Sequence, residues 1–214
     1  MNIFKKTLQK KIIASASSLL VLGFANSAAA QQSTTQSGFY VEPGITYEMG
    51  EHTVDWPLLS DSTGKTQGLG LLLRGGFHIN ETFFAGLDGR YSVPTFKDSS
   101  VNYDANSKSM NYGPFVGVQM PDYGLRLWGT YVMGGYLDPE ASGSLDVKVE
   151  EPKGLRVGAG YHIQSFSVNL EYEDLTYGKS ILEQAGSFTP GTTFDSVTLK
   201  NKTWILSATF PIEL

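Results

Sequence analysis

The sequence predicts an all-β fold in which eight antiparallel strands form an up-and-down barrel. Three observations predict this fold: apolar residues recur with a period of two, the connections between these runs alternate between short and long, and the two faces of each run differ in chemistry. The chain has 214 residues, of which 24 are glycine and none is cysteine. This length suits one domain, and the lack of cysteine excludes disulfide scaffolds, thiolate metal sites and thiol nucleophiles.

Residues 1–30 are predicted to be a cleaved signal peptide, which leaves residues 31–214 as the barrel domain. Four lysines between positions 5 and 11 form a basic start, residues 12–24 form an uncharged apolar run, and Ala28, Ala29 and Ala30 supply small residues for cleavage. Removing this segment reduces the 16 basic residues to 12 against 21 acidic residues, a net charge of −9. Without a basic patch, nucleic acid is not an expected partner.

Cleavage is expected after Ala30. Mass spectrometry of the mature protein should therefore show Gln31 as its first residue, because the small residues before it match the preference of signal peptidases. A mature chain that still begins with Met1 would overturn this prediction.

Eight runs with a period of two follow one another along the mature chain. They cover residues 38–49, 68–79, 83–93, 109–120, 124–137, 154–163, 166–177 and 200–212. Residues 80–82, 121–123 and 164–165 are short, turn-like connections, whereas residues 50–67, 94–108, 138–153 and 178–199 are long and polar. In an antiparallel meander this alternation places all the short turns at one end and all the long loops at the other, the layout of bacterial outer-membrane barrels.

The two faces of the runs differ throughout. One face is free of charge, as in Phe39, Val41, Ile45 and Tyr47 of the first run. The opposite face carries nine charged residues: Glu42, Glu48, Arg74, Asp88, Arg90, Arg126, Arg156, Glu171 and Glu173. Periodicity alone also allows a soluble, lipocalin-like barrel with the apolar face inside.

Two features favour lipid over water outside the barrel. Aromatic residues gather at both ends of the uncharged face, as expected for girdles at the two membrane interfaces. The predicted girdles contain Phe39, Tyr47, Phe77, Phe83, Tyr91, Tyr112, Tyr161, Phe166, Tyr172, Trp204 and Phe210. The charged face is rich in glycine, which leaves room for long side chains inside a narrow barrel but would only weaken strands on a water-facing surface.

These patterns resemble the small eight-stranded outer-membrane barrels typified by the OmpA transmembrane domain and by OmpX. The last run, through Trp204, Leu206, Ala208 and Phe210, is similar to the C-terminal assembly signal of that family, although the chain continues to Leu214. The resemblance implies the outer membrane of a Gram-negative bacterium, with the lipid, lipopolysaccharide and the barrel-assembly machinery as partners. Pro43 and Pro114 depart from a regular strand, and we expect a β-bulge at each.

The charged face predicts an ionic network inside the barrel. It comprises Glu42, Arg74, Asp88, Arg90, Arg126, Arg156, Glu171 and Glu173. An eight-stranded barrel is just wide enough to be filled by side chains, and buried charges must be paired. The favoured function is therefore an envelope-structural or surface-interaction protein with a plugged lumen. A narrow, nonspecific channel is the alternative.

A lipid-modifying enzyme is the third and least favoured hypothesis. It needs a base beside a serine near the outer leaflet, and only His52 lies in a long polar segment, with Asp55, Ser60 and Ser62 nearby. We expect no catalytic residues, no cofactor and no metal site, although the acidic segment 138–153 could hold divalent cations. Residues 144–150 alternate in polarity and could extend a strand whose free edge binds a surface protein by strand addition.

Overall fold

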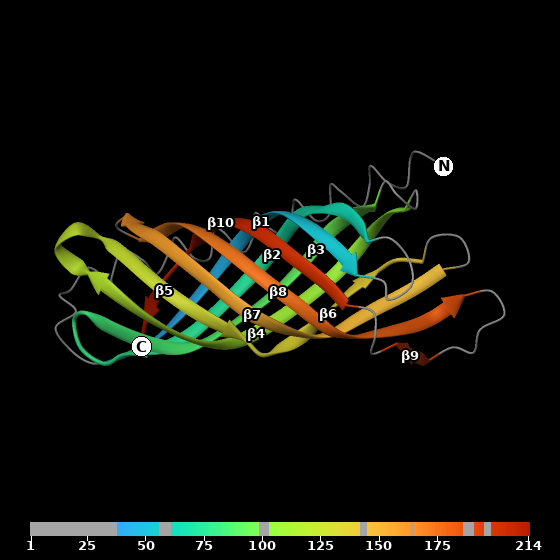
Figure 1. Ribbon diagram of the computed structural model, residues 1–214. Coiled ribbons are helices and arrows are strands. Elements are labelled where there is room, and N and C mark those ends of the chain that lie inside the picture. Colours follow the sequence, from blue (N-terminus) through green and yellow to red (C-terminus); the bar gives the residue numbers. More distant parts are fainter. Residues whose placement is uncertain are drawn as a thin grey trace. The chain divides into compact units, whose positions relative to one another are not determined.

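The computed structural model describes residues 38–55, 61–98, 103–141, 145–163, 165–185, 191–194 and 198–214; the predicted signal peptide lies outside these ranges. The strands are β1 (Phe39–Asp55), β2 (Ser62–His78), β3 (Phe83–Asp98), β4 (Tyr103–Met120), β5 (Leu125–Val132), β6 (Gly134–Pro139), β7 (Leu145–Ile163), β8 (Phe166–Ala185), β9 (Thr192–Phe194), β10 (Thr198–Thr209) and β11 (Ile212–Glu213) (Figure 1). A single 3₁₀ turn, η2 (Pro121–Tyr123), joins β4 to β5. No helix in these described ranges is long and apolar enough to cross a membrane.

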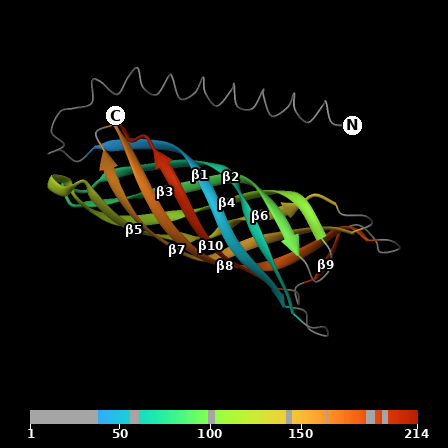
Figure 2. The same cartoon turned by 90° about the horizontal axis from the view of Figure 1, so that it is seen from above.

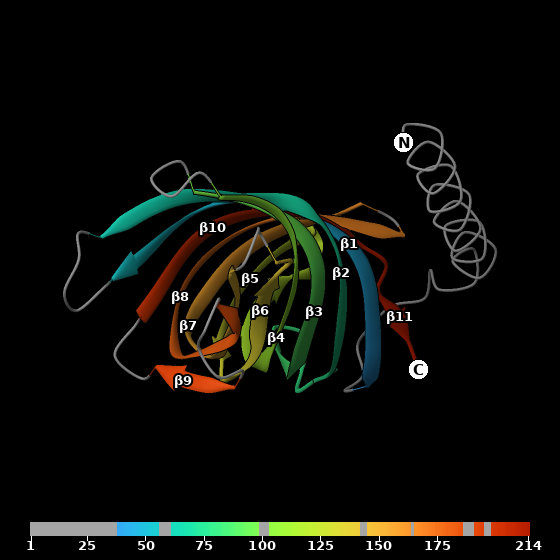
Figure 3. The same cartoon turned by 90° about the vertical axis from the view of Figure 1, so that its right-hand side faces the viewer.

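The strands close into an antiparallel ring. Each strand from β1 to β4 pairs with the next, β5 and β6 together form the fifth wall segment, and β7, β8 and β10 complete the ring, because β10 pairs back along β1 from Gly44 to Asp55. Figure 3 shows these strands curving around one interior. The predicted eight-stranded, up-and-down barrel is confirmed.

The strands extend much further than the polar composition of the chain suggested. Residues 50–55 were expected to be loop, but they pair with residues 198–203 of β10 and with residues 62–66 of β2. Residues 145–153 and 178–185, also expected to be loops, belong to β7 and β8. Polar side chains indicate contact with water, but the backbone of a polar segment can still form hydrogen bonds with a neighbouring strand. The predicted extension of a strand through residues 144–150 is confirmed for residues 145–150, and residue 144 lies outside the described residues.

Tight local structures form the short connections. Asn80 Oδ1 accepts the backbone N–H groups of Thr82 and Phe83 at 2.8 and 2.7 Å, the hydrogen bonds of an Asx turn. Gly124 follows η2 with a φ of 66°, a left-handed conformation that favours glycine. Figures 1 and 2 show β9 at the end of the barrel opposite the C-terminus.

The two prolines behave differently from each other. At Pro43 the expected bulge is wrong, because pairing runs from Glu42 to Gly44 without a change of register. Next to Pro114 the register does change: two residues of β4, Gly113 and Pro114, lie opposite three residues, which are the last two of β5, Tyr131 and Val132, and Met133 after it. The extra residue thus lies on the strand that faces the proline, where the missing N–H of Pro114 removes a ladder bond.

Three neighbouring strands exchange their inner and outer faces near the long connections. Successive inward residues there are three apart instead of two: Val132 and Gly135 where β5 passes into β6, Val149 and Pro152 on β7, and Tyr177 and Ser180 on β8. Positive φ angles accompany the step on β6 at Gly135 (139°) and on β7 at Glu151 (58°). A Cβ on Gly135 would lie 1.9 Å from the carbonyl oxygen of Met110, so only glycine fits.

The exchange has a clear chemical result. Beyond it, Leu137, Val149 and Leu182 are buried, while Lys148 and Glu150 lie on the outside and form an ion pair at 3.0 Å. Apolar residues inside and charged residues outside are typical of a sheet whose outer face meets water. Nearer the short turns the polarity of the wall is the reverse, with apolar residues such as Leu71 and Leu155 exposed on the outside.

Candidate functional site: the barrel lumen

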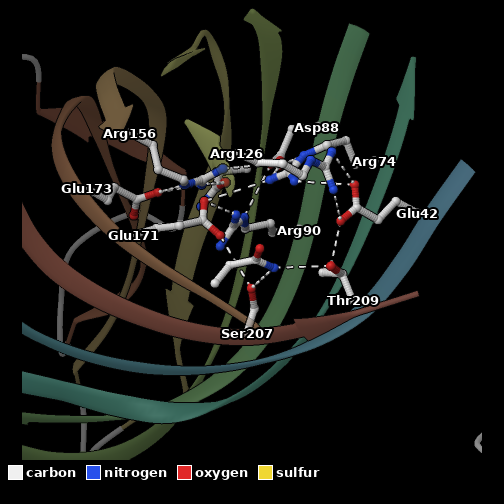
Figure 4. A network of polar contacts seen from close by, with 12 residues as sticks. Glu42, Arg74, Asp88, Arg90, Arg126, Arg156, Glu171, Glu173, Ser207 and Thr209 are labelled. Atoms are coloured by element: carbon white, nitrogen blue, oxygen red, sulfur yellow. Dashed lines mark hydrogen bonds and ion pairs between the residues drawn. The ribbon is translucent and has the colours of Figure 1, made fainter. Parts of the chain in front are cut away.

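Strand alternation places the charged residues of the sequence inside the barrel. Glu42, Arg74, Asp88 and Arg90 lie on β1, β2 and β3 at even positions, all of which face inward on those strands. Arg126 on β5, Arg156 on β7, and Glu171 and Glu173 on β8 face the same interior (Figure 4). The structure therefore brings all eight predicted network residues together, each with at most 6% of its surface exposed.

Glu42 joins two arginines from other strands. Its two carboxylate oxygens accept Arg126 Nη1 and Nη2 at 3.0 and 3.1 Å, a bidentate pair that fixes both position and orientation. Arg74 Nη1 lies 3.6 Å from Glu42 Oε2, and Thr209 donates its hydroxyl to the same carboxylate. These contacts link β1, β2, β5 and β10 across the lumen.

Asp88 is the centre of the network, because three arginines donate to it. Arg74 Nη2 lies 3.0 Å from Oδ2, while Arg90 Nε and Arg156 Nη1 lie 3.2 and 2.6 Å from Oδ1. A carboxylate shared by three guanidinium groups needs further acids nearby to balance their charge.

Glu171 and Glu173 supply that balance. Glu171 Oε2 accepts Arg90 Nη2 at 2.5 Å, and Glu173 Oε2 accepts Arg156 Nε at 2.8 Å. Arg156 also donates to Asn111. Asn169 continues the polar contacts toward β10, since its amide nitrogen donates to Ser207 and Thr209 at 3.1 Å each.

An aromatic layer lies on the short-turn side of the network. Tyr40, Phe84, Phe115 and Trp128 form a buried cluster that the sequence interpretation did not include. It is joined to the network by cation–π contacts: Arg74 Cζ lies 4.6 Å from the ring centre of Trp128, and Arg126 Cζ lies 4.8 Å from that of Phe84. All four aromatic residues occupy inward positions of their strands, so alternation alone could have placed them in the lumen.

An apolar layer lies on the long-loop side. Its buried members are Phe96, Val132, Leu137, Val149, Leu175, Tyr177 and Leu199. His52, which the sequence analysis placed in a long polar connection, instead lies inside the barrel, where its ring stacks on Phe96 at 3.7 Å between centroids. The expectation was wrong because β1 continues past position 50 and keeps its alternation.

Most of the aromatic residues predicted for the girdles lie on the outside of the barrel. Phe39, Tyr47, Phe77, Phe83, Tyr91, Tyr112, Tyr161 and Trp204 are exposed, and Phe166, Tyr172 and Phe210 are partly exposed. Two cross-strand pairs touch: the rings of Phe39 and Phe77 lie 6.3 Å apart near the short turns, and those of Tyr172 and Trp204 lie 5.0 Å apart on β8 and β10.

The barrel has an exposed apolar surface with aromatic pairs around a charged interior. This is the reverse of the distribution of apolar and charged residues in a soluble protein. The profile of the family described as "outer membrane protein beta-barrel domain" matches residues 17–210. The chain belongs to this family. As a member of it, the chain is an integral protein of the outer membrane of a Gram-negative bacterium.

Solved barrels resemble this member of the family at low identity. The Neisserial surface protein NspA is 13% identical, with a TM-score of 0.45 over 81% of this chain and 97% of that chain. The Yersinia pestis attachment invasion locus protein Ail, in complex with sucrose octasulfate, is 15% identical, with a TM-score of 0.47 over 82% and 99%. OprG from Pseudomonas aeruginosa is 9% identical, with a TM-score of 0.48 over 84% and 98%. No curated protein sequence matches the chain.

Histidines and surface acids are the remaining groups that could form a catalytic or metal site. His162 Nδ1 lies 3.0 Å from Ser167 Oγ, but this pair is at the short-turn end, away from the outer leaflet. Ser60, considered with His52 as an enzyme candidate, lies outside the described residues. Carboxylate oxygens of Asp138 and Asp146, from the segment where the sequence allowed divalent cations, lie within 4.8 Å of one another and of a carboxylate oxygen of Glu183 on β8.

Proposed function

We propose that this outer-membrane barrel is closed to solutes and serves an envelope-structural or surface-interaction role. The observation that carries the proposal is the stacking of three layers in one lumen: the aromatic layer, the ionic network and the apolar layer. The four arginines of the network are at most 6% exposed, which leaves little of their charged surface for ions in transit. The alternative function, a narrow channel, requires a continuous water path through all three layers.

We also propose that the chain is not an enzyme. The lumen charges are engaged with one another, and such mutual pairing supports a structural role for Asp88 and Arg156 more than a role in acid–base chemistry. A serine beside a base at the long-loop rim would favour the enzyme hypothesis. The histidine of that end, His52, is instead buried against Phe96.

The strand extensions support the surface role. Pairing between β6 and β7 ends at Leu137 and Val149 among the described residues, whereas β7 continues to pair with β8 as far as Leu145. In the described ranges, the edge of β7 from Leu145 to Lys148 has no ladder pair with β6, and we propose that it receives an extended segment of a surface protein. The exposed apolar wall contacts outer-membrane lipid and lipopolysaccharide, and the C-terminal strand is the segment for the barrel-assembly machinery.

Single-channel recording in a planar bilayer tests the closed lumen. The refolded wild-type barrel should conduct little, because eight strands leave no channel of porin width. Arg126→Ala removes the bidentate partner of Glu42 and the group above Phe84, so it should hydrate the lumen and raise the conductance. Lys97→Ala, which removes an exposed cation of β3, is the control and should conduct like wild type. A large, stable conductance of the wild type that is unchanged in Arg126→Ala would instead establish the channel.

A further inference from the structure

Lysine and arginine occupy different parts of the barrel. The four arginines of residues 31–214 lie in the lumen, whereas the eight lysines all lie in the parts of their strands nearest the long connections. Around the short turns and the C-terminus, the described charged residues are the acids Glu81, Asp122 and Glu213. Lysine therefore marks the side of the membrane on which the long loops lie, which is the outer side in barrels of this class.

One pair of these lysines follows directly on the apolar wall of β2 and β3. Four successive outward pairs of this ladder, taken from the membrane toward the long loops, are Leu71 with Tyr91, Leu69 with Val93, Gln67 with Thr95 and Lys65 with Lys97. Leu69 and Val93 are 65% and 53% exposed on the lipid-facing side. Successive outward pairs lie about 7 Å apart along the strands, so the face changes from apolar to charged within two pairs.

The two lysines of this ladder are directly opposite each other, and like charges in such a cross-strand pair repel. Lys97 Nζ lies 3.1 Å from Asp104 Oδ2 on β4, and both of these side chains are more than half exposed. Glu51 of β1 is the residue opposite Lys65, but we find no ion pair for Lys65 among the described residues. Exposed ion pairs contribute little, so both ammonium groups remain able to bind an anion.

Toward the membrane, the surroundings of the lysine pair are uncharged or positive. The next outward row on the described strands β1 to β4 consists of the directly opposed residues Met49, Gln67, Thr95 and Asn106. The next outward charge on β4 is a third lysine, Lys108, two residues nearer the membrane than Asn106. On this side of the pair, the charge that complements the lysines must therefore come from the lipid.

We propose that Lys65 and Lys97, together with the side chains of Gln67 and Thr95, bind a phosphate group of the lipid A part of lipopolysaccharide. A phosphate between the two ammonium groups removes their repulsion and forms charge-assisted hydrogen bonds with both. The amide of Gln67 and the hydroxyl of Thr95 can donate to the same phosphate from the membrane side. This inference rests on the proposed contact with lipopolysaccharide, and it adds the chemical group that is recognised and the residues that recognise it.

The wall beneath the site has room for the acyl chains of the same lipid. Gly89 is an outward residue of β3 below Val93, and a Cβ there would meet only the carbonyl oxygen of Leu73 at 3.8 Å. The missing side chain leaves a shallow gap beside Leu73, which is 58% exposed. Free phosphate cannot use these apolar contacts, so a phosphorylated lipid is the ligand that fits this face.

Native mass spectrometry of the refolded mature barrel in detergent micelles tests the site. Phosphorylated lipid A is titrated in parallel with lipid A from which the phosphates have been removed, so that the acyl chains stay the same. The wild type should bind the phosphorylated lipid more tightly, and this preference should shrink as the salt concentration rises, because salt screens exposed charges. Inorganic phosphate, added as a competitor, should displace the lipid only at a much higher concentration.

Two double variants separate the site from general charge effects. Lys65→Gln with Lys97→Gln should weaken the binding of phosphorylated lipid A roughly thirtyfold and leave the binding of the dephosphorylated lipid unchanged. Lys148→Gln with Lys179→Gln removes an equal charge from β7 and β8, across the barrel from β2 and β3 (Figure 3), and should bind both lipids like wild type. The single variant Lys65→Gln keeps the ion pair of Lys97 and should lose about fivefold.

Three results would overturn the proposal. The first is equal affinity of the wild type for the two forms of lipid A, and the second is an equal loss of affinity in the two double variants. Both would refute the lysine site and leave the proposed contact of the wall with lipopolysaccharide standing, whereas a wild type that binds neither lipid would refute both. The third is displacement of lipid A by an equal concentration of inorganic phosphate, since the site would then bind a free anion. The closed lumen is decided separately, by the conductance test.

Discussion

Replacing Arg156 with alanine is expected to lower the free energy of unfolding of the barrel by about 3–5 kcal/mol. Arg156 is fully buried, and it donates to Glu173 Oε2 at 2.8 Å and to Asp88 Oδ1 at 2.6 Å. Asp88 keeps Arg74 and Arg90 after the change, but Glu173 loses the only arginine with which we find it paired in the described structure. The cost therefore comes mainly from a buried carboxylate without a partner. Urea titration of the barrel in lipid vesicles measures it.

The double variant Arg156→Ala with Glu173→Gln is the matched control. The amide removes the unpaired charge, so the double variant should recover a large part of the stability lost in Arg156→Ala. If the double variant is instead less stable than Arg156→Ala by the full effect of Glu173→Gln alone, the two residues act independently. That result would contradict their assignment as a pair.

The sequence was sufficient to predict which residues share a face. In β2, Leu71 and Leu73 alternate with Leu72 and Arg74, and the structure exposes the first two and buries the others. This alternation has a period of two regardless of how the strands pair, so it can be read from one strand at a time. For the same reason, the inward aromatic residues Phe84 and Phe115 could have been recognised as a layer of the lumen.

The partners within the network could not be predicted. Arg126 binds Glu42, which precedes it by 84 residues, and Arg90 binds Glu171, 81 residues further along the chain. These contacts cross the lumen between strands that are not neighbours. They depend on the stagger with which β10 closes onto β1, a property of the whole ring that no single strand specifies.

The sequence analysis also did not predict where the strands end, or that the inward positions of three strands shift by one residue near the long connections. The position of His52 in the apolar layer depends on β1 continuing for several residues beyond the last girdle residue of that strand, Tyr47. The exchange at Gly135 depends on a positive φ, and many glycines of this chain lie in strands without one. The polar composition of the long segments therefore indicated which residues contact water. It did not indicate that the strands continue through these segments, or that the inward positions shift by one residue on some of them.

Replacing Leu71 with arginine is expected to cost about 2–4 kcal/mol of unfolding free energy in a lipid bilayer. Leu71 is 62% exposed on the outside of β2, where it lies between Ile45 of β1 and Tyr91 of β3, both also exposed. A guanidinium group at this level must be taken from water into hydrocarbon, or it must bend its side chain toward an interface and thin the bilayer locally. Reversible urea titration in vesicles of a single lipid gives the difference from wild type.

The control variant, Gln67→Arg, places the same cation on the same face of the same strand, four residues nearer the long-loop end. Gln67 is exposed and polar, and it lies beyond Leu69, the partner of the girdle residue Tyr47. The cost of a cation falls to about 0–1 kcal/mol near the interface, so Gln67→Arg should be nearly neutral. Comparing the two variants removes the effects of strand propensity and net charge, which they share. Equal costs would mean that position 71 does not face lipid, and the assignment of the outer face would then be wrong for β2.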